Sequence, residues 1–555
     1  MLEALFDAEW QRDLANNPVG ASMLGDKRYN HRWPDLSLEN LAQNRAKDQA
    51  TLDQLANIKR EQLSAANRLN YDLFKQGYVD RLKESRFERY LIPLNQRGGI
   101  QTQDTMLDSL RFSNKKDYLD WIARLESFPN YMQQTIDLMK AGQTKNILPP
   151  KVIMQRIPDQ IQLQLVDSPE ESGFYKPFKN KPDFIKPSEW KSLQSRAAAN
   201  IQAGVIPAYK KFHAFINNEY LPACRDTVGV WDSPDGQAFY QQRVKRFTTT
   251  ELSYDEIHQI GLSEVKRIRS EMQKIIDDLE FDGSFNDFLT FLRTDKQFYY
   301  ATPEELETAY LATSKRIDPE LVKLFGKLPR MPYGIKKIPD SIAPDTTTAY
   351  YSRPAADGSR AGFYYVNLYK PETRPKYEIE VLSVHEAMPG HHLQIALAME
   401  LGDLPNFRKL GGFTAFVEGW GLYSESLGGD LGLYKDPYSK FGQLTYEMWR
   451  AVRLVVDTGM HAKQWTRQQA IDFFKANAAK TEHDIVNEID RYIAWPGQAL
   501  AYKIGELKIK ELRARAEKQL GEDFDVREFH DLVLSQGAIP LNILENTIDA
   551  WLANK

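Results

Sequence analysis

Three of the nine histidines in this 555-residue chain fall within eight residues, in the segment VLSVHEAMPGHHLQ at positions 381–394. They are His385, His391 and His392, and Glu386 directly follows the first of them. Imidazole nitrogens bind zinc, and a carboxylate beside a metal can act as a general base toward water. In the metallopeptidase pattern H-E-x-x-H, the two histidines stand one helical turn apart. Here the later histidines come six and seven residues after the first, so the spacing itself needs an explanation.

A straight helix cannot bring these histidines to one ion. It rises ~1.5 Å per residue, so a residue seven positions later lies roughly 10 Å along the axis. Two nitrogens bound to one zinc ion, each ~2.0–2.1 Å from it, must lie within about 4 Å of each other. Pro389 lacks an amide hydrogen and interrupts the helix, and Gly390 removes the steric resistance to a bulge. We expect this pair to loop out and to return His391 to the metal. The alternative is a kinked helix with surface histidines.

A third ligand is expected from the segment FVEGWGLYSE at positions 416–425. Glu418 and Glu425 lie two helical turns apart on a face that is otherwise apolar, where an unpaired carboxylate is costly to bury. We predict Glu418 as the ligand and Glu425 as its supporting neighbour or substitute. The alternative is a pair of solvated glutamates. Cys224 is the single cysteine, so a multi-cysteine site is excluded and nitrogen and oxygen ligands are expected.

Two downstream segments carry further polar side chains. Arg450, Arg453, Asp457 and His461 share one stripe of a predicted helix, either as a buried ladder of ion pairs or as contacts to substrate or to a ligand. The segment RYIAWPGQALAYK at 491–503 gathers hydrogen-bonding side chains around a Pro-Gly break, where a tyrosine hydroxyl or a lysine can stabilise an oxyanion. The candidates for substrate contact or for support of the ligands are His392, Glu425, Asp457, His461, Arg491, Gln498, Tyr502, Lys503, Tyr350 and Tyr351.

Helical signals dominate the elements that must position these residues. Ser253 with Glu256 has the spacing of a capping box before apolar residues at helical intervals, and Thr302 before Pro303 is a second helix start. Similar amphipathic segments lie near 38–90, 115–141, 187–219, 440–477 and 498–520. We predict a mainly α fold: a large two-lobed helical body around a deep cleft. The N-terminal lobe would span 1–250 and the lobe with the metal site 251–555.

Two stretches depart from this helical pattern. Residues 147–189 contain seven prolines and predict an irregular connection over the surface. Residues 349–352 and 362–367 have strand character and are separated by a turn-like Asp357-Gly358. We expect a short hairpin there, which forms one wall of the cleft and offers an edge to which an extended peptide can pair.

Composition narrows the class of protein. Hydrophobic residues make up 42% and charged residues 27%, as in ordinary globular proteins. The formal charge of −4 comes without a basic patch, so no nucleic-acid partner is expected. The N-terminus has no secretory pattern and no stretch approaches 18 apolar residues, so we expect a soluble protein without a transmembrane segment. The sequence does not indicate an oligomeric state.

Several motifs together resemble the bacterial family known as domain of unknown function 885. They are HEAMPGHHLQ, FVEGWGLYSE, RLVVDTGMHAKQW and RYIAWPGQALAYKIG, with RYNHRWPDLS, ILPPKVIMQRIPDQ and AYYSRPAADGSRAGFYYVNL upstream. The resemblance extends over most of the chain. Members of that family are commonly predicted to be exported or lipid-anchored, and the resemblance therefore implies a periplasmic setting, or a lipid anchor if an export signal was removed.

The motifs are also similar to those of the gluzincin metallopeptidases, which include angiotensin-converting enzyme with its HEMGH helix and dipeptidyl peptidase III with HELLGH. By this resemblance HEAMPGH carries a two-residue insertion, and the shared Gly-His ending implies His391 rather than His392 as ligand. The Arg491-Tyr492 pair resembles the RYF segment of angiotensin-converting enzyme, which implies that Tyr492 assists the oxyanion.

These features together predict a zinc-dependent hydrolase, a metallopeptidase that acts on a peptide substrate. Zinc on His385, His391 and Glu418 would activate water, Glu386 would take its proton, and Tyr492 would stabilise the oxyanion. Two alternatives stay open: a non-catalytic helical protein that binds a peptide or a metal, and a metal-dependent amidase with a non-peptide substrate.

Overall fold

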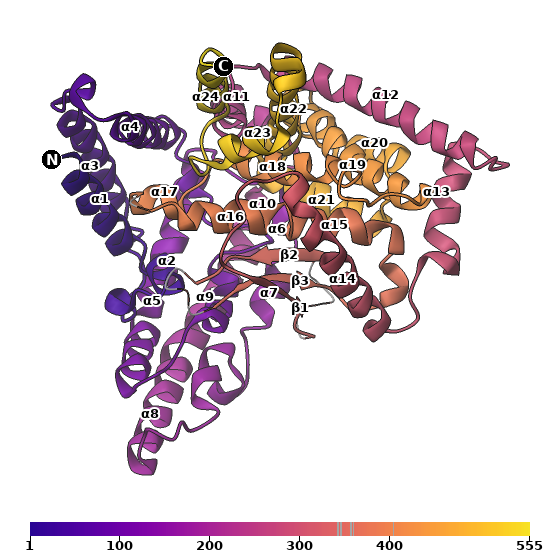
Figure 1. Cartoon of the computed structure of the whole chain (residues 1–555). Coiled ribbons are helices and arrows are strands. Elements are labelled where there is room, and N and C mark those ends of the chain that lie inside the picture. The colour runs from indigo at the N-terminus through magenta and orange to yellow at the C-terminus, as the bar shows by residue number, and fades with distance from the viewer. Residues whose placement is uncertain (341–342, 344–346, 356–357, 359, 403) are drawn as a thin grey trace. The chain divides into compact units, whose positions relative to one another are not determined.

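The computed structural model describes residues 1–340, 343, 347–355, 358, 360–402 and 404–555 (Figure 1). It divides into two compact units, Met1–Phe239 and Tyr240–Lys555, and the division falls within helix α11 (Gly236–Thr248). Helices dominate both units, and the described residues form one small sheet. The chain is therefore mainly α, as its sequence predicted. The deep cleft stays a prediction.

The first unit is built around the long helix α5 (Lys115–Thr144), which starts at a capping box of Asn114 with Asp117. Its buried face joins those of α8 (Pro187–Asn200) and α9 (Ile206–Phe215) in a core rich in aromatic rings. The other helices of this unit are α1 (Leu2–Asn16), α2 (Pro18–Met23), α3 (Leu38–Ala56), α4 (Ala65–Ser85), α6 (Lys151–Met154), α7 (Ile157–Gln162) and α10 (Leu221–Ala223).

The proline-rich stretch at 147–189 is not the surface connection that its sequence predicted. It contains α6 and α7, and its apolar side chains, among them Met154, Ile161 and Phe174, are fully buried in the core of the first unit. The physical reason is that several of its prolines start short helical turns, as Pro158 does in α7. Proline is tolerated at the first helical positions because no intrahelical bond needs its missing N–H.

The second unit begins with α12 (Tyr254–Asp278), and the predicted capping box is confirmed at its start, where the backbone N–H of Glu256 donates to Ser253 Oγ over 3.2 Å. Helix α12 packs along α19 (Pro437–Ala462), and α14 (Pro303–Ile317) likewise starts at its predicted Thr302 cap. Apart from α15 (Ile379–Glu386), α16 (His391–Glu400) and α18 (Thr414–Ser426), the remaining helices of this unit are α13 (Phe285–Thr294), α17 (Asn406–Leu410), α20 (Arg467–Asn477), α21 (Glu482–Ala494), α22 (Ala501–Leu520), α23 (Val526–Leu534) and α24 (Leu541–Leu552).

The sheet has the strand order β1-β3-β2, with bounds β1 (Tyr333–Lys337), β2 (Ala349–Ser352) and β3 (Gly362–Val366). The predicted antiparallel pairing of the second and third strands is confirmed, with Tyr351 opposite Tyr364. The parallel strand β1 was not predicted. The predicted turn at Asp357 lies outside the described residues. The sheet lies beside α14 and α15 (Ile379–Glu386), so it borders the histidine segment (Figure 1).

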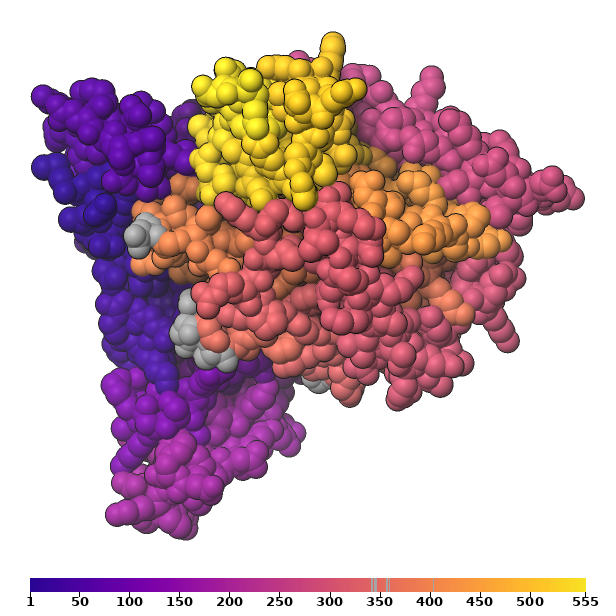
Figure 2. Space-filling model, in the orientation of Figure 1, coloured from indigo at the N-terminus to yellow at the C-terminus, as the bar shows by residue number. Residues whose placement is uncertain are grey.

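The C-terminal helices lie against the part of the second unit that carries the sheet, as the yellow and coral surfaces in Figure 2 show. One contact that fixes this arrangement is Asp531 on α23, whose Oδ1 accepts from the backbone N–H groups of Gly326 and Lys327, each over 3.1 Å. The elements that position the histidine segment therefore come from both the middle and the end of the chain.

Helix α18 (Thr414–Ser426), which carries Glu418 and Glu425, touches α22 backbone to backbone. A Cβ added at Gly505 would lie 1.9 Å from the carbonyl oxygen of Ala415, and one added at Gly419 would lie 2.5 Å from Gly505 Cα. Only glycine fits at both positions, because backbone atoms cannot move aside as a flexible side chain can. This contact fixes the height and rotation of the helix that presents the two glutamates.

Replacing Gly505 tests this packing. Gly505→Ala should lower the free energy of unfolding by about 1–3 kcal/mol, because its methyl group forces the two helices apart. The matched control is Gly429→Ala, since an added Cβ there has nothing within 4 Å and should change stability by less than about 0.5 kcal/mol. Both values can be measured by urea unfolding followed by circular dichroism. Equal stability of the two variants would show that the helices are not in close contact.

Candidate metal centre

The histidine segment folds as two helices with a loop between them. Helix α15 ends at Glu386, and α16 (His391–Glu400) begins after residues 387–390, which include a cis Met388–Pro389 peptide bond. The loop turns back on α15, because the N–H of Gly390 donates to the Val384 carbonyl over 2.9 Å. A Cβ added at Gly390 would lie only 1.9 Å from the carbonyl oxygen of His385, so no larger residue fits. The excursion places His391 at the start of α16 and beside His385.

His385, His391 and Glu418 converge on one point. Oε2 of Glu418 lies 3.9 Å from Nε2 of His385 and 3.5 Å from Nε2 of His391. Ligand atoms of the three residues lie within 4.8 Å of one another, and among the described residues this is the only cluster of its kind. Donor atoms in a tetrahedral zinc site with bonds of ~2.0–2.2 Å stand roughly 3.3–3.6 Å apart. The three side chains therefore fit a zinc ion after small movements.

His385 is oriented by a carboxylate behind it. Its Nδ1 lies 2.8 Å from Oε1 of Glu425, and the same oxygen lies 3.3 Å from Nη2 of Arg450 on α19. An imidazole that donates its Nδ1–H to this carboxylate presents the lone pair of Nε2 toward Glu418. Burial lowers the pKa of His385 to about 3 and raises that of Glu425 to about 7. The imidazole is thus neutral, which is the form that binds a metal.

His391 and Glu418 influence each other directly. Burial opposes the charged form of both, but their mutual attraction outweighs it, so the pKa of His391 is raised and that of Glu418 is lowered to about 2. Nδ1 of His391 is buried and has no hydrogen-bond partner among the described residues. Glu418 keeps 21% of its side-chain surface exposed and His391 keeps 12%, so the cluster is reachable from solvent.

His392 belongs to a different set of contacts. Its Nδ1 lies 2.8 Å from the hydroxyl of Tyr351 on β2, and its Nε2 lies 3.0 Å from the carbonyl oxygen of Met331. Both ring nitrogens are therefore engaged, and the ring holds the sheet against α16. Tyr350, the neighbouring candidate, stacks on Tyr365 with ring centroids 4.9 Å apart and lies outside the metal cluster.

Glu386 is the last residue of α15 and is partly exposed. Burial is the main influence on the pKa of both His385 and His391, and the negative charge of Glu386 acts in the opposite direction on both. The negative charge of Glu386 thus favours the protonated form of both imidazoles. Gly421 on α18 leaves room for the His385 ring, since an added Cβ would lie 2.8 Å from Cε1 of His385.

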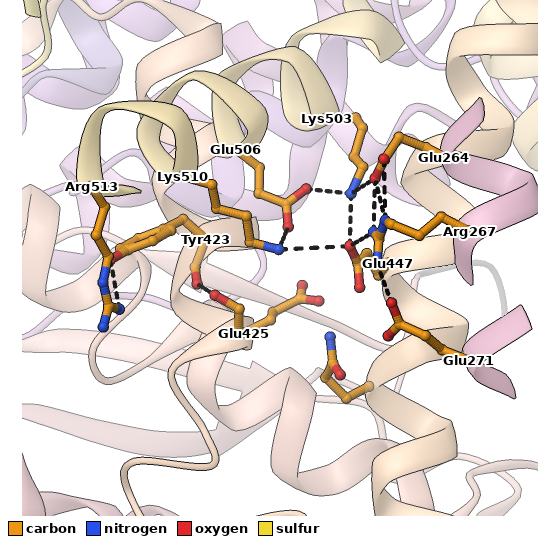
Figure 3. A network of polar contacts seen from close by, with 12 residues as sticks. Glu264, Arg267, Glu271, Tyr423, Glu425, Glu447, Lys503, Glu506, Lys510 and Arg513 are labelled. Carbon is orange, nitrogen blue, oxygen red and sulfur yellow. Dashed lines mark hydrogen bonds and ion pairs between the residues drawn. The ribbon is translucent and has the colours of Figure 1, made fainter. Parts of the chain in front are cut away.

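Behind Glu425 lies a buried cluster of charges, shown in Figure 3. Lys503 is fully buried, and its Nζ lies 2.6 Å from Glu506, 2.8 Å from Glu447 and 3.0 Å from Glu264. The predicted candidate Lys503 thus lies in this cluster and away from the three metal-site side chains. Other members are Arg267, which pairs with Glu264 and Glu447, and Lys510, which pairs with Glu506.

The remaining candidates surround the end of α21. Asp457 accepts from the hydroxyl of Tyr240 over 2.6 Å and from the N–H of Gly497 over 3.0 Å, and burial raises its pKa to about 7. Nε2 of His461 lies 3.0 Å from the carbonyl oxygen of Tyr492. These two residues hold the Pro-Gly break in place and do not join the metal cluster.

The hydroxyl of Tyr492 is buried in a network of its own. It donates to Oε2 of Glu488 over 2.7 Å and accepts from Nε of Arg453 over 2.8 Å and from Nε1 of Trp449 over 3.0 Å. To stabilise an oxyanion, the hydroxyl would have to exchange its bond to Glu488. Arg491 donates to Gln498 over 3.1 Å, and the Tyr502 ring lies under Arg453 with 4.3 Å from guanidinium to centroid.

Two residues of the Tyr492 network were not among the predicted site residues: Trp449 and Glu488. The stripe that contains Arg450 was visible in the sequence, but the contact of Arg450 with Glu425 was not. Glu488 stands four residues before Tyr492 and Trp449 four before Arg453, which is the spacing of neighbours on one helix face. That signal could have found both.

Residues 18–548 match the family described as "Bacterial protein of unknown function (DUF885)". Among solved structures, the chain is similar to a "putative lipoprotein" from Colwellia psychrerythraea, with 32% identity, a TM-score of 0.93, and coverage of 100% of this chain and 99% of that chain. A "putative lipoprotein of unknown function" from Shewanella oneidensis gives a TM-score of 0.78 at 17% identity, with 98% and 99% coverage, which shows the shared fold alone. No curated protein matches the chain.

Replacing His391 and His392 one at a time distinguishes the candidate metal ligand from the histidine that holds the sheet. If the cluster binds zinc, His391→Gln should abolish retention of one zinc ion per chain, because it removes one of the three candidate ligands. His392→Gln should retain zinc and lose about 1–2 kcal/mol of stability through its two hydrogen bonds. Zinc can be quantified by atomic emission after dialysis, and stability by thermal unfolding. The reverse pattern, with zinc lost only in His392→Gln, would assign the ligand to the other ring.

Lys503→Met tests the buried charge cluster. It leaves three carboxylates without their shared cation, and breaking a buried ion pair in this way typically costs about 3–5 kcal/mol. Lys508→Met on the same helix is the control, since Lys508 pairs with Glu511 near the surface and should change stability by less than about 1 kcal/mol. Chemical unfolding of both variants gives the comparison. A loss in Lys503→Met no greater than in the control would mean that the cluster is not held by this lysine.

Proposed function

The chain belongs to the bacterial family DUF885. We propose that it is a zinc-dependent hydrolase that cleaves peptide bonds, with His385, His391 and Glu418 as the zinc ligands. The observation that carries the proposal is the convergence of two imidazoles and a carboxylate. A second carboxylate, Glu386, directly follows His385 at the end of α15. Two histidines with one glutamate is the ligand set of thermolysin-type peptidases.

The residues of the chain divide the work among them. His385, His391 and Glu418 would hold zinc, which supplies a Lewis acid that polarises a carbonyl group and acidifies water. Glu386 accepts a proton from the attacking water and passes it to the leaving amine as the C–N bond breaks. Glu425 keeps Nδ1 of His385 protonated, and Arg450 neutralises Glu425 from behind. Tyr492 stays the candidate for stabilising the oxyanion.

A peptide as substrate is supported by the small sheet. Strand β2 is an edge strand, and its Tyr351 is hydrogen-bonded to His392, the neighbour of the ligand His391. An extended chain that adds to a free strand edge satisfies its backbone groups by hydrogen bonding. A peptide bound in this way would lie along the metal cluster.

The setting we propose is outside the cytoplasm. It is supported by the lipoprotein description of the Colwellia psychrerythraea protein. Among the described residues, no helix has the length and apolar character needed to cross a membrane.

Glu386→Gln is the decisive variant for the proposed function. It should reduce hydrolysis of a peptide library by at least about 100-fold, because general-base catalysis contributes 10²–10⁴-fold. Zinc content and thermal stability should stay at wild-type values, because Glu386 is not a ligand. Removal of zinc by a chelator should abolish hydrolysis, and added zinc should restore it. Glu372→Gln, at an exposed residue outside the site, is the matched control and should cleave normally.

Each other outcome has a distinct meaning. Full activity in Glu386→Gln would remove this residue from catalysis. A zinc-loaded wild-type protein that binds peptides but cleaves none would indicate a non-catalytic peptide-binding protein. Cleavage of non-peptide amides alone would indicate an amidase.

A further inference from the structure

Two buried arginines lie side by side next to the Tyr492 network. Arg453 on α19 is 4% exposed, and Arg491 on α21 is 8% exposed. Both approach the same oxygen, Oε2 of Glu488, at 3.1 Å from Nη2 of Arg453 and 3.3 Å from Nη2 of Arg491. The side chain of Glu488 is itself 21% exposed.

The two guanidinium groups keep unused donors. Nη1 of Arg453 and Nε of Arg491 are buried and have no hydrogen-bond partner among the described residues. Leaving such a group unsatisfied costs about 1–3 kcal/mol, and more for charged groups. A ligand oxygen at this position would supply the acceptor that these donors lack.

Aromatic side chains hold Arg453 in position. Its guanidinium lies 4.6 Å from the ring centroid of Trp449 and 4.3 Å from that of Tyr502. An arginine that is fixed in this way is preorganised to donate a charge-assisted hydrogen bond from its free Nη1 to a carboxylate.

The arginine pair lies next to the proposed metal centre. Arg450, one helical turn before Arg453 on α19, contacts Glu425, which in turn contacts His385. A step of three residues advances about 4.5 Å along a helix. The arginine pair is therefore linked to the metal cluster through one turn of α19 and two side-chain contacts.

We propose that Arg453 and Arg491 form a subsite that binds a carboxylate of the substrate, close to the peptide bond that is cleaved. This inference rests on the proposed function and narrows its substrates to peptides with a negative group near that bond. The carboxylate is either the C-terminus of the peptide or the side chain of an aspartate or glutamate. The first source would make the protein an exopeptidase that acts from the C-terminal end.

Binding without turnover tests the subsite. Zinc-loaded Glu386→Gln protein would be titrated with fluorescently labelled Ala-Ala-Ala as the free acid, as its amide, and as an amide in which glutamate replaces one alanine. The free acid should bind at least about tenfold more tightly than its amide, because a hydrogen-bonded charge pair is lost in the amide. Tight binding of the glutamate-containing amide would identify a side chain as the source of the carboxylate.

The same titrations with a second substitution identify the arginines. In Arg453→Met and in Arg491→Met, the preference for acid over amide should fall to within about twofold. Arg453→Lys keeps the charge without the planar guanidinium and should lie between, which guards against misfolding in the methionine variants. Arg515→Met is the control, since its partners Glu511, Glu545 and Asp549 lie on α22 and α24.

Equal binding of acid and amide, or binding of neither, would overturn the subsite, as would a preference that survives both methionine variants. The hydrolase proposal is judged separately, by cleavage with the unmodified protein. A preference that depends on the arginines in a protein that cleaves nothing would leave the subsite standing and remove the hydrolase. Cleavage without any such preference would do the opposite.

Discussion

The turn between α15 and α16 is held by a steric constraint on which the whole centre depends. Gly390 sits so close to the carbonyl of His385 that even a methyl group would overlap it. This close approach lets the chain reverse direction within the four residues 387–390. The imidazole of His391 is thereby returned to that of His385. A regular helix would have carried the two rings to different levels. The remaining parts of the site, including Glu418, presuppose this reversal.

Around the turn, buried charges are arranged so that each has a partner. Glu425 lies between His385 and Arg450, and farther back Lys503 is shared by three carboxylates. Burying ions is costly unless they are paired and hydrogen-bonded. Nδ1 of His391, Nη1 of Arg453 and Nε of Arg491 are among the buried polar atoms of the described residues that have no hydrogen-bond partner. The proposed zinc ion and the proposed substrate carboxylate would lie close to these atoms.

Local sequence patterns predicted local structure well. The caps at Ser253 and Thr302 and the antiparallel pairing of β2 with β3 depend on neighbours in sequence, and the structure contains all three. The Pro389-Gly390 pair likewise indicated where the helix breaks. In contrast, the prediction of an irregular surface connection at 147–189 was wrong. Its seven prolines indicate breaks between helices, but proline can also begin a helix.

What could not be predicted depends on residues far apart in the chain. The contact of Arg450 with Glu425 and the parallel pairing of β1 with β3 are set by tertiary packing, which leaves no periodic signal. The interruption at Pro389-Gly390 favoured His391 as ligand, and the resemblance to known motifs supported His391 over the adjacent His392. In the sequence, only the four-residue interval to Tyr492 pointed to Glu488. No local pattern predicted that Arg453 and Arg491 would both contact its carboxylate.

The glycine contact between α18 and α22 has a consequence for how the protein matures. Helix α18 supplies Glu418, yet the surface against which it is seated starts at Ala501. During synthesis, the ribosome must reach α22 before the surface that seats α18 exists. Until then a nascent chain would carry both imidazoles without a firmly placed Glu418 carboxylate. If the proposed zinc site exists, it could therefore be completed only after α22 has been made.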